Sequence, residues 1–546
     1  MQKKRIFPIA LLFILCLVIC SAVACNNVKN PAITDQEQDD YSDEIELTLR
    51  DGSYAVTDYH GDAANVIIPE SKDGISVTVI SEEAFRESAN LVSVTLPESI
   101  RTIGNNAFYK CKLLSQLQLP NGITSIGDGA FYGCESLKSV SLPTELSSLG
   151  TAAFSGCVNI TEIRFARKIS DIGDQAFYGC NSLLDFIVDA TNPFYKDEDG
   201  VLIHKKNALV SFPAGRCGSY RIPTEITKIG DYAFAECKNL TELDLNSVTE
   251  IGAHAFQSSG LTSVLLPVSV QTLGEYAFYQ CSALKTADIG TITSLPESVF
   301  RNCTSLTDLQ LNSVCSINNQ AFEDCTSLKN IFLPESLSQI GNFVFSGCVN
   351  LNDITVSASN HTFRDENGVL LNAEGNKIIT FPCGRTGSYI VPDGIKDINA
   401  FAFFGCSLEE IDFSDVASIG RSAFADCSFL KNVTFSDNLQ NIGEGAFDGC
   451  SSLTIIELPS GITEIRQLTF RNCSSLSQIT LSQNLISIGQ MAFTDCTSLK
   501  NIALPASLQY VDFAAFAGCL SLSIHFSGST ADWEPGWNPD NCPVIV

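Results

Sequence analysis

Cysteine thiols are the most numerous groups in this chain that could do chemistry. Of 22 cysteines, fifteen stand three residues after the phenylalanine of a recurring phrase, most often Ala-Phe-x-x-Cys. Thiols at a fixed spacing could form disulfides, hold a metal ion or act as nucleophiles. Disulfides are disfavoured if the phrases stack, because stacked strands lie about 4.8 Å apart and a disulfide needs Cβ atoms about 3.5–4.5 Å apart. We therefore predict a row of buried free thiols, with Cys111, Cys134 and Cys157 among its members. The redox state of four further cysteines outside this row stays open: Cys217, Cys315, Cys383 and Cys542.

No other combination of residues points to catalysis or to a metal. Paired CxxC ligands are absent, and the five histidines do not recur in register with a serine or cysteine. A triad assembles in space rather than in sequence, but nothing here favours one. The stretches 197–200 and 365–368 look like calcium loops, yet the acidic twelfth position of an EF-hand would be Ala208 and Asn376. We predict no enzyme activity, no cofactor and no metal.

Short repeats must position the thiols. Aligned on the phenylalanine, about seventeen units follow one another at steps of 21–23 residues, with two longer steps of 57 and 58. So many self-similar units at a short period predict a solenoid. The aligned residues are Phe85, Phe108, Phe131, Phe154, Phe177, Phe234, Phe256, Phe278, Phe300, Phe322, Phe345, Phe403, Phe424, Phe447, Phe470, Phe493 and Phe516.

One unit predicts the path of a single coil. Leu91, Val94 and Leu96 have the spacing of a short strand, which Pro97 ends because proline cannot donate to a ladder. The residue four before the repeat phenylalanine is glycine in eleven units, which predicts a left-handed turn there. The Ala-Phe-x-x-Cys phrase then predicts about one helical turn.

The repeat phenylalanine predicts a buried aromatic ladder, because half of the 34 phenylalanines occupy this one position. Phe108, Phe131, Phe154 and Phe278 are representative members. The complete phrase, LxxVxLPxxIxxIGxxAFxxCxxL, resembles the BspA-like leucine-rich repeat family over about residues 85–526. The resemblance implies a right-handed leucine-rich-repeat solenoid. It also implies a bacterial surface or secreted protein, several relatives being adhesins that bind host matrix proteins.

The first 25 residues have the character of a lipoprotein-type signal peptide. Basic residues 3–5 precede an apolar run, and Ala22-Val23-Ala24-Cys25 resembles a bacterial lipobox, with Ala22 where leucine is usual. We expect Cys25 to be acylated and to attach the protein to the outer face of the cell membrane. An uncleaved membrane anchor and ordinary secretion are the alternatives. Each of the three places the repeats outside the cytoplasm.

The rest of the chain divides at the two long steps. Asp-Gly and Asn-Gly pairs before apolar runs predict hairpins in two matching inserts. The predicted segments are an acidic flexible stalk (26–46), N-terminal cap strands (47–84), repeat block 1 (85–180), insert 1 (181–229), repeat block 2 (230–350), insert 2 (351–398), repeat block 3 (399–526) and a C-terminal cap with both tryptophans (527–546).

Surface residues provide the candidate binding sites. The net charge is −28 and no stripe of basic residues is present, which argues against a nucleic-acid partner. The negative charge keeps the protein soluble or, alternatively, attracts a cationic partner. The middle residue of each repeat strand should face outward, and Leu265 and Phe332 stand out on an otherwise polar strip as anchors or as stray apolar residues. The positions are Thr95, Gln118, Ser141, Arg164, Asp244, Leu265, Asp288, Gln310, Phe332, Thr355, Asp412, Thr434, Glu457, Thr480 and Ala503.

These observations favour a non-enzymatic cell-surface protein that binds a protein of a host or neighbouring cell, or of its matrix. The alternative is an envelope module for glycans or peptides, to which Trp533, Trp537 and the inserts would contribute. A hydrolase is the third and weakest hypothesis.

Overall fold

The structure is a computed structural model that describes residues 44–527 and 533–545. The signal peptide with Cys25 and most of the predicted stalk lie outside the described residues. Within the described ranges no helix is long and apolar enough to cross a membrane.

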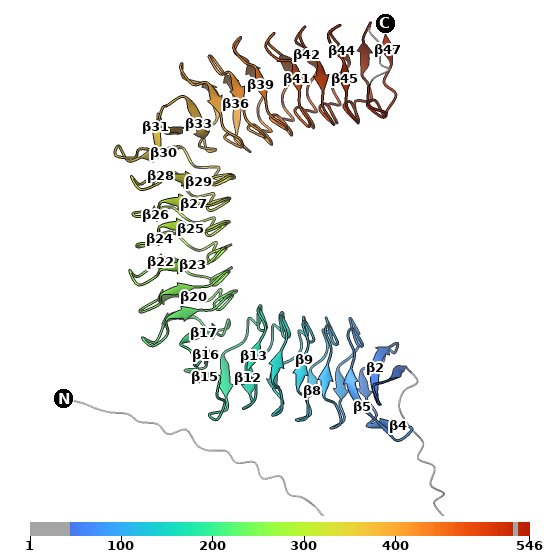
Figure 1. The fold of residues 1–546 in the computed structure, drawn as a ribbon. Coiled ribbons are helices and arrows are strands. Elements are labelled where there is room, and N and C mark those ends of the chain that lie inside the picture. Colours follow the sequence, from blue (N-terminus) through green and yellow to red (C-terminus); the bar gives the residue numbers. More distant parts are fainter. Residues whose placement is uncertain (1–43, 528–532, 546) are drawn as a thin grey trace, which may run out of the picture. The chain divides into compact units, whose positions relative to one another are not determined.

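The protein is a β-solenoid in which each coil contributes one strand to each of two faces. Figure 1 shows the stacked coils, with β22, β24 and β26 beside β23, β25 and β27. We call the strands of the LxxVxL segments, together with the cap and insert strands that pair with them, the face strands. They are β3 (Asn65–Ile67), β6 (Ser93–Thr95), β8 (Gln116–Gln118), β10 (Ser139–Ser141), β12 (Glu162–Phe165), β14 (Asp185–Val188), β18 (Gly218–Arg221), β20 (Leu240–Asp244), β22 (Ser263–Leu265), β24 (Thr286–Asp288), β26 (Asp308–Gln310), β28 (Asn330–Leu333), β30 (Asp353–Val356), β34 (Gly387–Ile390), β36 (Leu408–Asp412), β38 (Asn432–Thr434), β40 (Ile455–Glu457), β42 (Gln478–Thr480), β44 (Asn501–Ala503), β46 (Ser523–His525) and β47 (Val544–Ile545).

The two-residue strands before the Ala-Phe phrase form the second face, and we call them the back strands. They are β7 (Thr102–Ile103), β9 (Ser125–Ile126), β11 (Ser148–Leu149), β13 (Asp171–Ile172), β19 (Lys228–Ile229), β21 (Glu250–Ile251), β23 (Thr272–Leu273), β25 (Ser294–Leu295), β27 (Ser316–Ile317), β29 (Gln339–Ile340), β35 (Asp397–Ile398), β37 (Ser418–Ile419), β39 (Asn441–Ile442), β41 (Glu464–Ile465), β43 (Ser487–Ile488) and β45 (Tyr510–Val511). Face and back strands pair in parallel with the equivalent strands of neighbouring coils.

The first back-face sheet begins in the N-terminal cap and ends at β13. Its cap strands are β1 (Ile45–Arg50), β2 (Ser53–Tyr59), β4 (Ser71–Lys72) and β5 (Ile75–Ile80). β1 and β2 pair antiparallel, and β2 then pairs in parallel with β5, which leads into the repeats.

The two inserts contain the hairpins that the Asp-Gly and Asn-Gly pairs predict. In the first, β15 (Tyr195–Glu198), β16 (Val201–His204) and β17 (Ala208–Ser211) are antiparallel neighbours. The second repeats this with β31 (Phe363–Glu366), β32 (Val369–Asn372) and β33 (Lys377–Thr380). In both turns the two central residues have positive φ, as the two-residue hairpin requires.

The Ala-Phe-x-x-Cys phrase is a series of turns, so the predicted one-turn helix is wrong. Asn106 and Lys110, on either side of Phe108, have φ of 53° and 55°, and such left-handed residues turn alternate amides out of the coil. The amides of Asn106, Phe108 and Lys110 therefore donate to carbonyls of the next coil, at 2.6–2.8 Å, while Tyr109 and Cys111 donate three residues back. Hydrogen bonds between coils replace those that a helix would form within itself.

The glycine four residues before the phenylalanine is not left-handed, contrary to the sequence-based prediction. In this part of the coil the backbones of neighbouring coils approach closely. A Cβ on Gly274 would lie 2.4 Å from the backbone nitrogen of Ala253, and one on Gly104 would lie 2.6 Å from that of Glu82. Glycine avoids this contact because it has no Cβ, although six units carry another residue at the position, among them Pro296 and Asn318.

Phenylalanine rings form the centre of the solenoid as three stacked segments, each within one hydrophobic cluster. Phe278 lies between Phe256 and Phe300, with ring centroids 5.0 and 5.2 Å away and planes within 8°. Two further rings from the inserts join the ladder: Phe212 stacks on Phe234 at 5.1 Å and Phe381 on Phe403 at 4.6 Å. The ladder restarts at each insert, where the back-face sheet is also interrupted.

Candidate functional site

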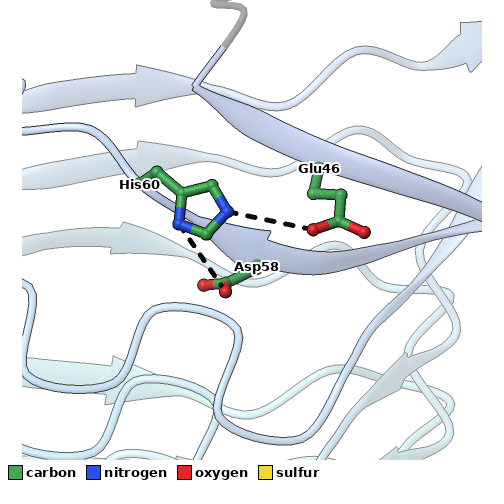
Figure 2. Close-up of side chains that lie close together, drawn as sticks. All are labelled: Glu46, Asp58 and His60. Carbon is green, nitrogen blue, oxygen red and sulfur yellow. Dashed lines mark ion pairs between the residues drawn. The ribbon is translucent and has the colours of Figure 1, made fainter.

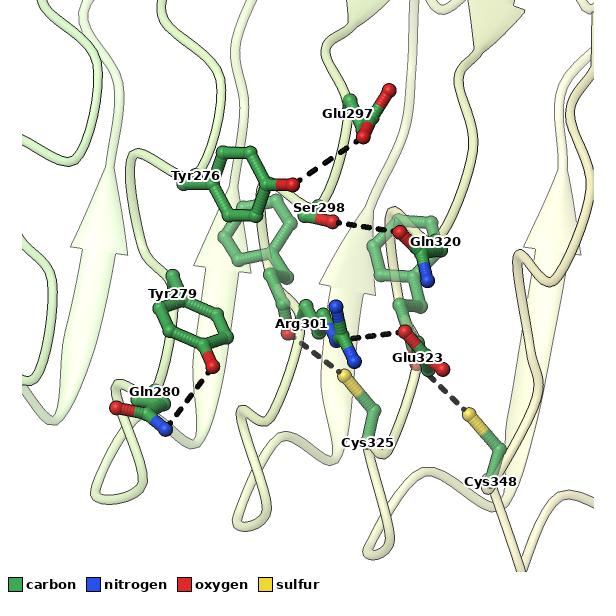
Figure 3. Close-up of polar contacts among 12 residues, drawn as sticks. Tyr276, Tyr279, Gln280, Glu297, Ser298, Arg301, Gln320, Glu323, Cys325 and Cys348 are labelled. Carbon is green, nitrogen blue, oxygen red and sulfur yellow. Dashed lines mark hydrogen bonds and ion pairs between the residues drawn. The ribbon is translucent and has the colours of Figure 1, made fainter.

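The fifteen row cysteines are buried free thiols with a specific hydrogen-bond partner. Apart from Cys406, each thiol approaches the carbonyl of the stacked phenylalanine one coil earlier, which for Cys237 is Phe212 of the insert at 3.8 Å. Cys111 donates to Phe85 O at 2.9 Å and Cys303 to Phe278 O at 3.1 Å. Figure 3 shows the same contact for Cys325 and Cys348. The row thus satisfies carbonyls inside the core, a role that the sequence pattern did not indicate.

Burial also makes these thiols chemically inert. It raises the pKa of Cys111 to about 12 and that of Cys281 to about 11, so the nucleophilic thiolate is almost absent at neutral pH. Nothing in this arrangement activates a nucleophile.

The four cysteines whose state was open fall into two groups. Cys217 and Cys315 are exposed. Cys383 and Cys542 are buried and lie beside row members: Cys406 donates to Cys383 Sγ at 3.1 Å, and Cys542 donates to Cys519 O at 3.3 Å.

We expect thiol titration to separate these groups. In soluble residues 26–546, which contain nineteen cysteines, Cys217 and Cys315 should react quickly with a thiol reagent under native conditions. The remaining thiols should become reactive only in denaturant. Ready reaction of many thiols in the native protein would contradict the buried row, and so would a largely oxidised protein.

The predicted face residues lie where the strand pattern placed them, but they do not form one cluster. Leu265 and Phe332 are 70% and 57% exposed, in β22 and β28. Their register neighbours in the next coil are Asp288 and Thr355, so neither has an apolar partner there.

The charged members of the prediction differ in their contacts. Arg164 is exposed and pairs with Glu162 of the same strand, with Nε 2.6 Å from the carboxylate. Asp412 accepts the amide of Ser414 at 2.9 Å, and this contact shapes the turn after β36. Glu457 is exposed in β40, opposite Thr480.

Shallow depressions follow the face strands. One of about 540 Å³ is lined by Thr95 and Gln118, and a second, of about 500 Å³, is lined by Thr434 and Glu457. A third, of about 360 Å³, has Leu265 at its edge. The face therefore offers several shallow contact areas rather than one deep pocket.

A polar edge runs along the turns of the central coils. There Tyr276 donates to Glu297 at 3.3 Å, and the Arg301 Nε lies 2.7 Å from a Glu323 carboxylate oxygen (Figure 3). Burial raises the pKa of Glu323, and Arg301 partly offsets this. These contacts link successive coils and leave no group poised to act on a substrate.

The C-terminal tryptophans pack on the solenoid. Trp533 is 5% exposed and lies against Phe526, with centroids 4.9 Å apart. Trp537 packs edge-on against Phe516, the last repeat ring, at 6.1 Å. Trp533 thus presents no free ring face for stacking on a sugar.

One group of possible metal ligands occurs among the described residues, in the N-terminal cap. Figure 2 shows Glu46, Asp58 and His60, whose ligand atoms lie within 4.8 Å of one another. His60 Nε2 is 3.8 Å from Glu46 and Nδ1 is 3.7 Å from Asp58. All three side chains are at least half exposed, so the group has the character of a surface ion-pair cluster.

Comparison with known proteins identifies the family. A signature described as BspA type leucine-rich repeat region, in six copies, matches residues 60–191, 211–315, 293–389 and 396–523. The chain belongs to the BspA-type leucine-rich repeat family. No curated protein matches it.

Solved leucine-rich repeat structures resemble this BspA-type chain in fold. A leucine-rich cell surface protein from Faecalibacterium prausnitzii is 23% identical, with 90% of this chain and 95% of that chain covered and a TM-score of 0.37. A leucine-rich repeat protein from Eubacterium ventriosum is 20% identical, with 83% and 93% covered and a TM-score of 0.42. The pneumococcal vaccine antigen PcpA is 15% identical, with 93% and 98% covered and a TM-score of 0.34.

Sequence reasoning missed apolar residues on the face of this BspA-type solenoid, among them Ile67 of β3, which is 68% exposed and in register with Thr95, and Ile390. Ile390 in β34 is 68% exposed and lies in register with Asp412. It occupies the outward strand position, but it belongs to the second insert and was therefore not aligned with the repeats. The alternation in Ser388-Tyr389-Ile390 before Pro392 was the available signal.

Proposed function

We propose that this leucine-rich repeat protein is an exported, non-enzymatic surface protein that binds a macromolecular partner through its face strands. The observation that supports this most directly is the exposure of Leu265, Phe332 and Ile390 at equivalent outward positions. Repeat proteins commonly recognise partners through such an extended regular surface.

The energetics of this surface suit a protein partner. Complete burial of an exposed phenylalanine or leucine contributes about 1.5–3 kcal/mol, and large apolar residues within a polar surround are typical anchors of interfaces. Leu265, Phe332 and Ile390 each have a polar register neighbour in the next coil (Asp288, Thr355 and Asp412), which can form part of the hydrated rim of such a contact.

Export and lipid attachment at Cys25 form the second part of the proposal. Replacing Cys25 with serine should abolish incorporation of a labelled fatty acid and release the protein from the membrane fraction. A second variant, Cys217→Ser, controls for loss of an exposed thiol and should label normally. Unchanged labelling of Cys25→Ser would contradict lipid attachment.

The proposed function can be tested with soluble residues 26–546 on an array of extracellular-matrix proteins and glycans, at low and physiological salt. We expect saturable binding to at least one protein that survives deglycosylation of that protein. Binding only to glycans, or turnover on a panel of hydrolase substrates, would contradict the proposal.

A further inference from the structure

The strongest unassigned site lies where repeat block 1 meets the first insert. A cavity of about 160 Å³ is lined there by residues 172–178 of the last block 1 coil, residues 208–212 and Ala214 of the insert, and parts of the first block 2 coil. Such a volume holds several water molecules and is smaller than the pockets of drug-sized ligands, which are about 300–1,000 Å³. It suits one small ring.

Backbone donors face this cavity because the stack is interrupted. In regular coils, the amides of the repeat phenylalanine and of the residue two before it donate to the next coil, as those of Phe154 and Ala152 do. The insert removes that next coil, and the amides of Phe177 and Gln175 have no acceptor among the described residues. Both residues line the cavity.

An aromatic platform and two carboxylates complete the lining. Tyr276, His254 and Tyr232 form a stack with centroids 4.7 Å apart and planes within 6°. Tyr232 ends this stack and lines the cavity, so one face of its ring is covered by His254 and the other is directed to the junction. The exposed Asp174 lies at the rim, whereas the Asp231 carboxylate accepts the amide of Ala253 in the following coil at 2.8 Å. Both carboxylates add to the raised pKa of Tyr232, whose main cause is burial.

Tyr178 makes the remaining wall rigid. Its hydroxyl donates to Glu236 at 2.9 Å and accepts from Gln257 at 3.1 Å, which joins block 1 to block 2. The Tyr178 ring stands at 89° to that of Tyr232, with centroids 6.3 Å apart. The wall is therefore fixed before any ligand arrives.

The second insert provides an internal comparison. At the equivalent junction Phe343 replaces Gln175, Phe401 replaces Tyr232 and Phe404 replaces Ala235. These rings fill the space, with Phe343 only 4.2 Å from Phe401 and 4.9 Å from Phe404 by centroid. The amides of Phe343 and Phe345 likewise have no acceptor among the described residues, so what distinguishes the first junction is its open space and the Tyr232 ring.

We propose that the first junction binds a single pyranose ring, as a free sugar or as the terminal residue of a glycan. Amide donors, the Asp174 carboxylate and an aromatic face together match the hydroxyl groups and the apolar C–H face of such a ring. A purely cationic ligand would leave the amides of Gln175 and Phe177 unpaired, and a purely anionic one would meet Asp174 and Asp231. This site is separate from the protein-binding face.

The test uses soluble residues 26–546 and ligand-observed NMR with glucose, galactose, mannose and N-acetylglucosamine, with N-acetylarginine amide as the cationic alternative. We expect saturable binding of at least one sugar. Ala235→Phe, which introduces the filling residue of the second junction, should weaken it at least tenfold, and so should Asp174→Asn. Phe404→Ala at the second junction is the matched control and should leave binding unchanged.

Thermal melting of each variant shows whether the fold survives, and Asp174→Asn keeps the test valid if Ala235→Phe destabilises the protein. The proposal is overturned if no sugar binds, if only the arginine derivative binds, or if sugar binding persists in both folded variants. Because the face-strand residues are untouched, this failure would be distinct from failure of the protein-binding proposal.

Discussion

Replacement of Phe278 by alanine is expected to lower the free energy of unfolding by about 3–5 kcal/mol. The side chain is completely buried and stacks on Phe256 and Phe300. Its removal loses the transfer free energy of the ring and leaves a cavity that the hydrogen-bonded coils on both sides cannot collapse to fill. Urea denaturation followed by far-ultraviolet circular dichroism measures the loss.

The control for this prediction is Phe332→Ala, which removes the same ring from the surface. We expect it to change the unfolding free energy by no more than about 0.5 kcal/mol. Similar losses for the two variants would mean that the ladder is not the stabilising core.

Gly274→Ala should destabilise the protein by about 3 kcal/mol, the upper end of the usual range for overpacking. The added Cβ would meet the Ala253 nitrogen and the Gly252 carbonyl carbon, both at 2.4 Å. The backbone cannot move away, because the Gly274 amide donates to Ile251 O at 2.9 Å. A side chain could rotate out of such a contact, whereas two backbones cannot.

Gly230→Ala is the control, because the same substitution is made at the same repeat position but with a milder predicted backbone contact. Gly230 occupies the same repeat position, but its nearest neighbour, Leu209 O, would lie 3.1 Å from a Cβ. A small shift relieves that contact, so we expect a loss below about 1 kcal/mol. Equal losses at Gly274 and Gly230, measured by the same denaturation, would show that close approach is not the reason for the glycine.

The solenoid architecture could be predicted from the sequence because it follows from the repeat period. Self-similarity at 21–23 residues requires stacking, and the Asp199-Gly200 and Asn367-Gly368 pairs specify hairpin turns locally. Features that depend on the next coil were not predictable from one unit. The Ala-Phe-x-x-Cys phrase has helical spacing, but amides such as that of Phe108 find their acceptors in the neighbouring coil.

Among the candidate sites, too, features within one repeat could be predicted, whereas features between distant segments could not. Outward positions such as Phe332 follow from strand alternation within one repeat. The junction cavity does not, because Tyr178 and Tyr232 are separated in sequence by the whole first insert. Likewise Phe212 and Phe381 join the ladder from Ser-Phe-Pro and Thr-Phe-Pro segments that lack the repeat phrase, and only their stacking on Phe234 and Phe403 reveals it.

The most direct test of the account compares two phenylalanines of equal exposure on different surfaces. Phe332 is 57% exposed on a face strand, and Phe429 is 58% exposed in the turn before β38. The measurement is the Kd of soluble residues 26–546 for the protein partner found on the array. If the face strands are the binding surface, Phe332→Ala should weaken binding at least about tenfold, which corresponds to about 1.4 kcal/mol, and Phe429→Ala should leave the Kd unchanged. Unchanged affinity of Phe332→Ala, or an equal loss in both variants, would contradict the assignment of the face strands as the interaction surface.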